Sequence, residues 1–473
     1  MKSMMKAFGA VALSGAVVIP ALAGTDTETP KDLKKVLQDQ GINYVETAQK
    51  GITLSGYVDT SYTYQFAGAG QYGPAATNAG GGPGNTQAAL RQFDTSNNTF
   101  NVNAVKIALE KALPDKNEWA AGFRIDTIYG SDAKYLNDTA FTSSSTNNSG
   151  FALEQALVKF RIPVGNGLDI YMGKFVTFLG YEVIESPANP NFSRGLLFTN
   201  AIPLTTTGVY ADYKFNDIVE AKLGIVDGWN NSTSSSVNAN SSSKLGTFGT
   251  QTIGTSNDES SFGKAITGQI NITNPGKNAN ICQSFIYSPE GEPGVVGVDN
   301  STVVVYDIWG NWNPTFVKDS ALTLGFNVDL GYAGGGTPYN PTGIPGGLGG
   351  STNGEPDSTT WWGVALYSQY KFNKVVSIAG RAEYLHEDPS ANPKFNPDTA
   401  AVNPNTGGLL SAGNQDDFSF TATLSFNIWD NLLTRVEYRY DHIYAGSEGG
   451  AGGVGSSYEA DQNEISLNAV YSF

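Results

Sequence analysis

The chain lacks long apolar runs and has few cysteine, histidine and charged residues. After residue 23 it contains no run of about 18 apolar residues, which excludes a membrane-spanning helix in that part of the chain. Cys282 is the only cysteine, so an internal disulfide is excluded, and we expect this side chain to pack as a small apolar residue. Charged residues make up 15% of the chain, against about 25% in an average soluble domain.

The residues that are abundant favour strands and turns. The chain has 56 Gly, 23 Tyr and 24 Phe. This composition is typical of β-barrels in an outer membrane, where alternate residues of each strand face lipid. The formal charge of −16 makes nucleic acid a poor partner, because nucleic-acid binding needs basic surface.

The first residues predict an exported protein. Lys2 and Lys6 precede an apolar stretch over 7–22, and Ala21 to Ala23 has the small-x-small pattern of a cleavage site. We therefore expect a signal peptide over 1–23. The alternative, a retained anchor, is disfavoured because the stretch is short for a span.

The segment 24–50 is expected to lie in the periplasm. Residues 31–42 can form a short amphipathic helix, and a flexible tail is the alternative.

The C-terminal strand alternates between two environments, with Val470 as the one apolar residue on the polar face. Its apolar residues, at 465, 467, 469, 471 and 473, share one face, as the period of two in a β-strand requires. A terminal strand that ends in Phe473 resembles the assembly signal of bacterial outer-membrane barrels. We therefore expect the barrel-assembly machinery to be a partner.

The rest of the chain repeats strands joined by alternating short and long connections. The predicted strands are 51–66, 98–111, 117–130, 152–162, 167–178, 205–216, 218–228, 262–273, 280–288, 302–312, 320–333, 359–372, 375–388, 416–428, 431–444 and 459–473. This pattern predicts an all-β fold: a transmembrane antiparallel up-and-down β-barrel over 51–473, with short periplasmic turns and long extracellular loops. Sixteen strands are expected, with 14 or 18 as alternatives. An even number lets the last strand pair with the first and leaves no edge exposed to lipid.

The apolar face of each strand is predicted to face lipid. Over 416–428, Phe418 and Phe420 lie on one face, while Ser419 and Thr421 lie on the other. In a soluble barrel the apolar face would be inside. Here the apolar face ends in aromatic residues suited to interfacial girdles, and the polar face carries many charges.

The interior of the barrel, its lumen, is expected to carry ladders of opposite charge. The residues of these ladders are Arg124, Asp126, Arg381, Glu383, Arg435, Glu437 and Arg439. They either create a transverse field in a water-filled channel or brace the barrel wall. A 16-stranded barrel is wide enough for an aqueous channel, which is the main argument for passive diffusion of small hydrophilic solutes and ions.

One long connection, 179–204, differs from the others because it is apolar and rich in proline. Exposing this apolar segment to water would cost free energy, so we expect the segment to fold into the lumen and narrow the channel. Glu182, Glu185 and Arg194 would then reach the channel, and Lys174 would point inward beside them. The alternative is that the segment packs on top of the barrel or against a neighbouring subunit.

The eight long connections hold 14 Asp or Glu and 5 Lys or Arg. An acidic mouth attracts cations within about 8 Å at physiological salt, which predicts a mild cation preference. No metal-ligand spacing is present, and no metal or cofactor is expected.

Three stretches resemble the OmpL-like β-barrel porin-2 family. They are GYVDTSYTYQF at 56–66, DIYMGKFVTFLGYEVIESPANPNFSRG at 169–195 and TTTGVYADYKFNDIVEAKLGIVDGWN at 205–230. The resemblance extends over nearly the whole mature chain. It implies a barrel in the outer membrane of a Gram-negative bacterium with a porin role and no catalytic residues.

Two other functions remain open. A structural or adhesive barrel would have a plugged lumen. An outer-membrane hydrolase would need a Ser and a His that face lipid at the outer rim. The strand alternation places His386 and His442 on the lipid face near this rim, but the simpler interpretation is that both belong to the aromatic girdle. We expect a protein that is not an enzyme, that contacts lipid and lipopolysaccharide, and for which a homotrimer is possible.

Overall fold

The computed structural model describes the strands of the chain and some of their connections. The described residues are 51–66, 93–94, 98–114, 117–136, 150–228, 247–248, 251–252, 264–289, 302–318, 321–336, 357–388, 415–445 and 458–473. The signal peptide expected over 1–23 and the periplasmic segment expected over 24–50 lie outside these residues, as do most residues of the long connections.

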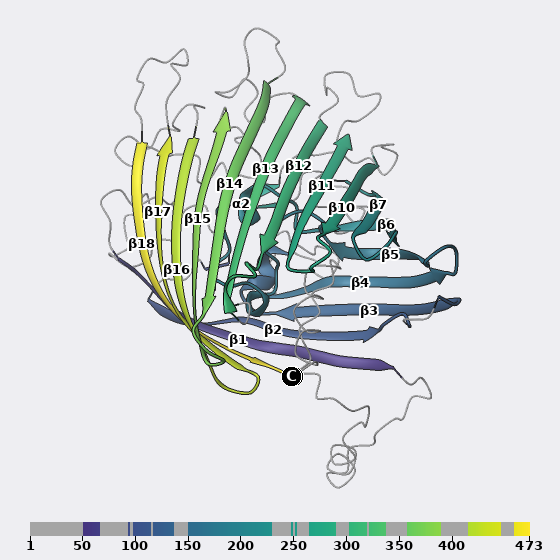
Figure 1. Ribbon diagram of the computed structural model, residues 1–473. Helices are drawn as coiled ribbons and strands as arrows, with labels where there is room; N and C mark the ends of the chain where they lie inside the picture. Colours follow the sequence, from purple (N-terminus) through teal and green to yellow (C-terminus); the bar gives the residue numbers. More distant parts are fainter. Residues whose placement is uncertain are drawn as a thin grey trace.

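Sixteen of the described strands form one closed antiparallel barrel (Figure 1). They are β1 (Ile52–Phe66), β2 (Thr99–Lys111), β3 (Ala120–Tyr129), β4 (Phe151–Ile162), β5 (Leu168–Val176), β6 (Thr205–Lys214), β7 (Val219–Val226), β10 (Ala265–Thr273), β11 (Ala279–Pro289), β12 (Thr302–Trp312), β13 (Leu322–Gly336), β14 (Asp357–Lys371), β15 (Val376–Asp388), β16 (Gln415–Trp429), β17 (Leu432–Ala445) and β18 (Tyr458–Ser472). The predicted barrel and its strand number are confirmed. A separate two-stranded sheet, β8 (Thr247–Phe248) with β9 (Gln251–Thr252), was not predicted.

The barrel closes between its first and last strands, as the even strand number requires. β1 pairs with β18 from Tyr57 opposite Ser472 to Phe66 opposite Asn463. Beyond this ladder, Gly56 and Phe473 exchange two backbone hydrogen bonds of 2.9 Å. The C-terminal residue therefore completes the pairing that leaves no open edge.

Short helical turns lie in two of the connections. They are η3 (Asp132–Tyr135), η5 (Ser186–Ala188) and α2 (Leu196–Asn200). In the described part of the chain, no helix has both the length and the apolar character needed to cross a membrane. In Figure 1, α2 lies within the ring of strands.

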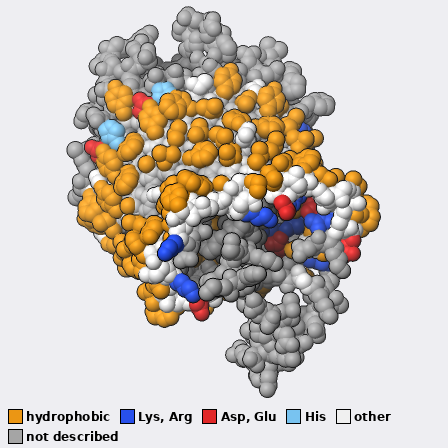
Figure 2. All heavy atoms as spheres, in the orientation of Figure 1, with side chains coloured by type: hydrophobic (Ala, Val, Ile, Leu, Met, Phe, Trp, Pro, Cys, Tyr) orange, Lys and Arg blue, Asp and Glu red, His pale blue; other side chains and the backbone are white. Residues whose placement is uncertain are grey.

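The outer face of the barrel is apolar and the inner face is polar. On β16, Phe418 and Phe420 are each 43% exposed, whereas Ser419 and Thr421 are fully buried. Figure 2 shows the outward side chains as a broad hydrophobic band around the strands. Large aromatic and aliphatic side chains exposed all round a barrel indicate a surface solvated by lipid, so the predicted lipid face is confirmed.

Local irregularities interrupt the alternation at several places, and two of them lie on strands next to the β5–β6 connection. Between β3 and β4, Asp126 pairs with Gln155 but the next residue, Thr127, pairs with Leu153, so Glu154 is the extra residue of a bulge. On β5, Gly173 has φ +136°, and a Cβ there would lie 2.1 Å from a backbone oxygen of β4, so only glycine fits.

Candidate functional site

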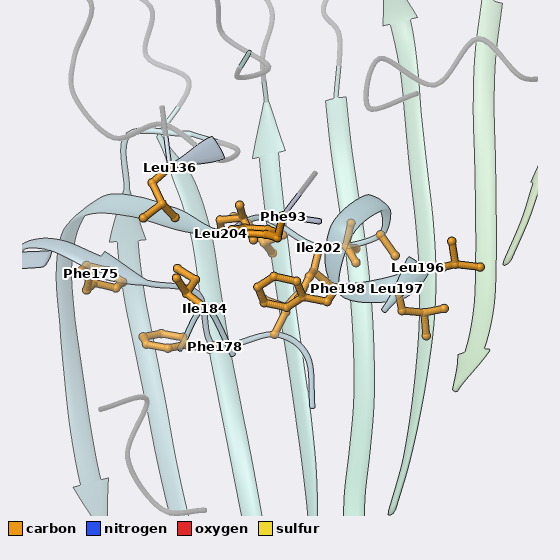
Figure 3. Close-up of a cluster of buried hydrophobic side chains, with 14 of the residues drawn as sticks. Phe93, Leu136, Phe175, Phe178, Ile184, Leu196, Leu197, Phe198, Ile202 and Leu204 are labelled. Atoms are coloured by element: carbon orange, nitrogen blue, oxygen red, sulfur yellow. The ribbon is translucent and has the colours of Figure 1, made fainter. Parts of the chain in front are cut away.

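The segment 177–204, which joins β5 to β6, is buried inside the barrel. Its apolar side chains form a cluster with inward-facing residues of the strands (Figure 3). Phe192, Leu197 and Ile202 are each at most 1% exposed, and Trp361 of β14 donates its indole N–H to the carbonyl of Ala201 at 3.2 Å. The segment therefore supplies an apolar core to a lumen whose wall is mostly polar.

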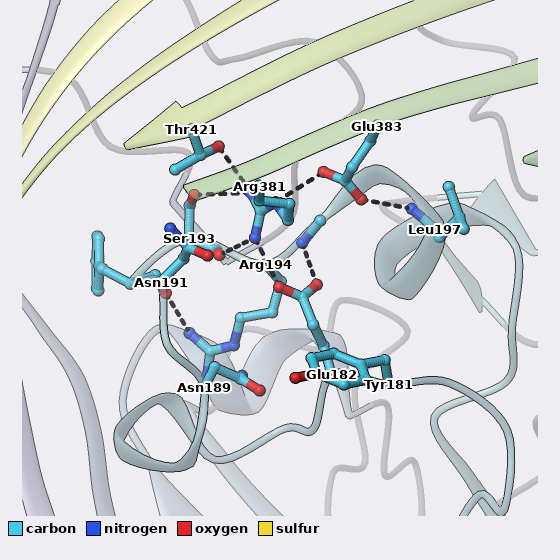
Figure 4. Close-up of polar contacts among 12 residues, drawn as sticks. Tyr181, Glu182, Asn189, Asn191, Ser193, Arg194, Leu197, Arg381, Glu383 and Thr421 are labelled. Carbon is cyan, nitrogen blue, oxygen red and sulfur yellow. Dashed lines mark hydrogen bonds and ion pairs between the residues drawn. The ribbon is translucent and has the colours of Figure 1, made fainter. Parts of the chain in front are cut away.

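Arg381 of β15 holds the middle of this segment (Figure 4). Its guanidinium donates to Glu182 and to the Ser193 carbonyl, both at 2.6 Å, and to Thr421 of β16 at 3.1 Å. It also forms an ion pair of 2.8 Å with Glu383, two residues along its own strand. All of these charges are buried, so Arg381 is the shared cation of one carboxylate from the segment and one from the wall.

Glu437 of β17 accepts hydrogen bonds from the backbone of the segment. The N–H groups of Phe192 and Ser193 donate to its two carboxylate oxygens at 2.6 Å and 2.9 Å. The hydroxyl of Thr423 donates to the same carboxylate at 2.6 Å. A fully buried carboxylate is stable only with such partners, so Glu437 and the backbone satisfy each other.

Arg435, also on β17, binds backbone carbonyls of the segment. Its guanidinium donates to the carbonyl oxygens of Ser186, Asn189 and Asn191 at 3.0–3.2 Å. Its Nε donates to Asn468 of β18 at 2.9 Å. Three carbonyls that converge on one guanidinium fix the shape of the segment around 186–191.

A second network joins the segment to β2, β3 and β4. The ammonium of Lys106 lies 2.8 Å from Glu154 and 3.2 Å from Asp126, and it also pairs with Glu185 of the segment. Asp126 is also bound by Arg124 at 2.8 Å. Burial opposes ionisation of Glu185, but the Lys106 ammonium and a hydrogen bond with Glu154 lower its pKa to about 2.

The three carboxylates of this network are close enough to hold a cation. Oxygen atoms of Asp126, Glu154 and Glu185 lie within 4.8 Å of one another. The Lys106 ammonium lies among them and supplies the compensating positive charge.

Arg194 links the segment to the connection that follows β3. Its guanidinium pairs with Asp132 at 3.2 Å and also donates to the carbonyl of Ile184. Burial raises the pKa of Asp132 to about 7, although Arg194 acts against this shift. The Arg194 carbonyl accepts a hydrogen bond of 2.7 Å from Arg439, which pairs with Asp441 at 2.8 Å.

The opposite wall also holds the start of the segment. The backbone N–H of Tyr181 donates to Asn327 of β13 at 2.8 Å. The carbonyl of Phe178 accepts from Gln269 of β10 at 2.6 Å and from Ser284 of β11 at 2.9 Å. The segment is thus tied to strands on several sides of the barrel.

Ten of the eleven residues predicted for the lumen belong to these networks. The eleven are Lys174, Glu182, Glu185, Arg194, Arg124, Asp126, Arg381, Glu383, Arg435, Glu437 and Arg439, and none is more than 5% exposed. Lys174 lies near the end of β5, and its ammonium donates to the carbonyl of Leu153 at 2.5 Å. Glu154 and Asp132 complete the networks but were not predicted.

The fold and its buried segment define a class of protein: a 16-stranded outer-membrane β-barrel with one connection folded inside. The family model described as "Putative beta-barrel porin-2, OmpL-like" matches residues 51–473, so the chain belongs to this family. The resemblance noted in the sequence is confirmed, and the protein is an outer-membrane channel.

Solved structures of outer-membrane proteins are similar to this chain at low identity. OprB of Pseudomonas putida, in a high-pH structure, has a TM-score of 0.51 at 11% identity over 93% of this chain and 96% of that chain. The channel DcaP of Acinetobacter baumannii has a TM-score of 0.49 at 11% identity over 90% of this chain and 99% of that chain. An anion-selective porin from Comamonas acidovorans has a TM-score of 0.49 at 12% identity over 89% of this chain and 99% of that chain. OprB supports the barrel fold and nothing further. No curated protein matches the chain.

Proposed function

We propose that this protein is a diffusion porin in which the segment 177–204 forms the constriction of a water-filled channel for small hydrophilic solutes and ions. One observation carries this proposal. The segment lies inside a barrel wide enough for an aqueous channel and is held there by charged side chains of the wall. The residues predicted for the lumen then set the width and the field of the pore.

The charges of the constriction are nearly balanced. The eleven residues predicted for the lumen include six basic and five acidic side chains. Five of them are paired with one another: Arg124 with Asp126, and Arg381 with Glu182 and Glu383. Paired charges in a wet channel favour polar solutes without selecting strongly for either sign. We therefore propose only a mild cation preference, which the excess of acidic residues in the long connections supports.

Planar-bilayer recording of the refolded protein tests this function. A porin gives large steady current steps, and a mild cation preference gives a small reversal potential of cation sign under a salt gradient. Raising the salt concentration should reduce that preference, because the charges at the mouth are screened. A folded barrel without steps would refute the channel, and a reversal potential of anion sign would refute the preference.

A plugged structural or adhesive barrel is the second candidate. The observation that favours it is the burial of all eleven predicted residues, which leaves those side chains little contact with solvent. In that case the segment is a permanent core and the long connections carry the function. The same recording separates the candidates, since a plugged barrel gives no steps.

The remaining proposals concern export and assembly. We propose that 1–23 is removed as a signal peptide and that 24–50 lies in the periplasm. Phe473 is proposed as the residue that the assembly machinery reads, with lipopolysaccharide and two further copies of the chain as partners in the membrane. We propose no catalytic activity.

A further inference from the structure

Aromatic rings line the lumen where the segment 177–204 begins. On β5 and β6, Tyr171 and Tyr210 stack with 4.5 Å between their ring centroids and 3° between their planes. Phe178 of the segment meets the ring of Tyr210 edge to face at 4.9 Å. The ring of Phe175, on β5, lies 5.6 Å from that of Phe178, and Figure 3 shows both phenylalanines. Together these residues form the first aromatic group.

A second aromatic group lies further along the segment. Tyr181 stacks on Tyr367 of β14 at 4.2 Å, and it meets Trp309 of β12 edge to face at 5.8 Å. A Cβ on Gly325 of β13 would lie 2.8 Å from the Tyr181 ring, so this glycine leaves room for the ring. Residues 178–181 are bound to β10, β11 and β13, which lie between the two groups. The rings therefore form one aromatic face from β5 to β14.

The tyrosine hydroxyls of this aromatic face have no partner in the part of the chain that the structure describes. The side chains of Tyr171, Tyr181 and Tyr210 are half-buried, and none of their hydroxyls makes a hydrogen bond with a described residue. A tyrosine hydroxyl that is withdrawn from water usually has a hydrogen-bond partner. These hydroxyls are therefore available to a molecule inside the lumen, as both donors and acceptors.

The cations next to this face are already paired with carboxylates. Lys159 and Lys222 place their ammonium groups 5.8 Å and 5.6 Å from ring centroids of the first aromatic group. Lys159 also pairs with Glu110, and the Lys222 ammonium lies 3.9 Å from Glu220. Because the charges are paired, the face offers apolar rings and hydroxyls rather than a net charge. A ligand that matches it is uncharged, with an apolar face and several hydroxyls.

We propose that the aromatic face binds uncharged sugars, so that the solutes of the channel include small oligosaccharides. This inference rests on the proposed function, because a sugar reaches the face only through an open lumen. The C–H face of a sugar ring packs against the exposed parts of the tyrosine rings, and this contact removes apolar surface from water. The sugar hydroxyls exchange hydrogen bonds with the tyrosine hydroxyls. Sites for small molecules commonly combine aromatic walls with a few polar groups in this way.

Block of the ion current by a sugar tests this inference. The refolded protein is recorded in planar bilayers with raffinose, an uncharged trisaccharide, or with polyethylene glycol of the same hydrodynamic radius. Raffinose should lower the conductance with a saturable dependence on concentration, and the polyethylene glycol should lower it less and without saturation. Equal effects of the two would overturn the inference, because size alone would explain them. Trigalacturonate, which carries carboxylates, should block no more strongly than raffinose, and a tighter block would overturn the assignment of an uncharged ligand.

The same recording separates this inference from the proposed function. A barrel that conducts ions but is not blocked by raffinose would overturn the inference and leave the channel intact. A folded barrel without current steps would overturn the channel and the inference together.

Substitution of tyrosine by phenylalanine removes the hydroxyl and keeps the ring. Tyr171→Phe combined with Tyr210→Phe should raise the half-blocking concentration of raffinose about tenfold, which corresponds to a loss of about 1.4 kcal/mol. Tyr181→Phe should raise it by a smaller factor. Tyr287→Phe is the matched control, since its side chain is 46% exposed on the lipid face, and it should leave the block unchanged. An unchanged half-blocking concentration in both lumen variants would refute the assignment, as would an equal loss in Tyr287→Phe.

Discussion

Replacing Arg381 with methionine should release the segment 177–204 from the wall formed by β15 and β16. The change removes the donor to Glu182 at 2.6 Å, to the Ser193 carbonyl at 2.6 Å and to Thr421 at 3.1 Å. It also leaves Glu383 without its ion pair of 2.8 Å. Two buried carboxylates then lose their shared cation, while methionine keeps most of the side-chain volume.

The magnitude follows from the burial of these groups. Breaking a buried ion pair by removing one partner costs about 3–5 kcal/mol, because the remaining charge is uncompensated. Since 1.4 kcal/mol is a factor of ten, the equilibrium between the anchored and released segment should shift by about 100-fold or more. Glu182→Gln combined with Arg381→Met should recover part of this loss, since one uncompensated charge is gone.

Single-channel recording measures the effect. Arg381→Met should give larger or noisier current steps than the unaltered protein, because a released segment widens or fluctuates in the channel. Lys159→Met is the matched control: Lys159 of β4 is also a buried lumen cation, but its described ion pair is with Glu110 of β2, another wall strand. Steps of unchanged size and noise from a folded, heat-modifiable Arg381→Met barrel would refute the anchoring role.

Three further predictions follow from the same contacts. Glu437→Ala leaves the N–H groups of Phe192 and Ser193 without an acceptor, which costs about 1–3 kcal/mol for each group. The segment should then be released, and the single-channel conductance should rise. Glu437→Gln keeps one acceptor oxygen and should raise the conductance less. Deleting Phe473 removes both hydrogen bonds to Gly56 and should lower the yield of heat-modifiable barrel on gels, whereas deletion with full yield would contradict its assembly role. Burial raises the pKa of Asp132 to about 7 in the folded protein, above its ordinary value. The protonated Asp132 side chain therefore contributes fully to the free energy of unfolding below about pH 4, and this contribution is lost as the pH rises to 7. Asp132→Asn should flatten the pH dependence of the unfolding free energy over that range, and an unchanged slope would refute this assignment.

The sequence predicted the barrel because lipid imposes a strict period on every strand. Over 417–426 each residue alternates between lipid and lumen, and the structure follows this pattern up to the irregularity in the pairing of β16 with β17 after Phe426. The interior charges at 381, 383, 435, 437 and 439 were placed by the same parity. Where the period held, sequence alone was sufficient to assign the face of a side chain.

The parts that the sequence did not predict are those where the period fails. Glu154 is the extra residue of a bulge, so parity cannot assign its face. Asp132 lies in a connection without periodicity, and only the fold brings it to Arg194. Pairings such as that of Arg381 with Glu182, separated by 199 residues, depend on strand register and on the path of the segment, neither of which a single sequence fixes.

The conductance of the unaltered protein, refolded from residue 24 and recorded in planar bilayers, tests the central claim most directly. We predict large, steady single-channel steps with a weak cation preference, because a 16-stranded barrel is wide enough for an aqueous channel. The absence of steps from a folded barrel would contradict the account and assign the segment 177–204 as a plug.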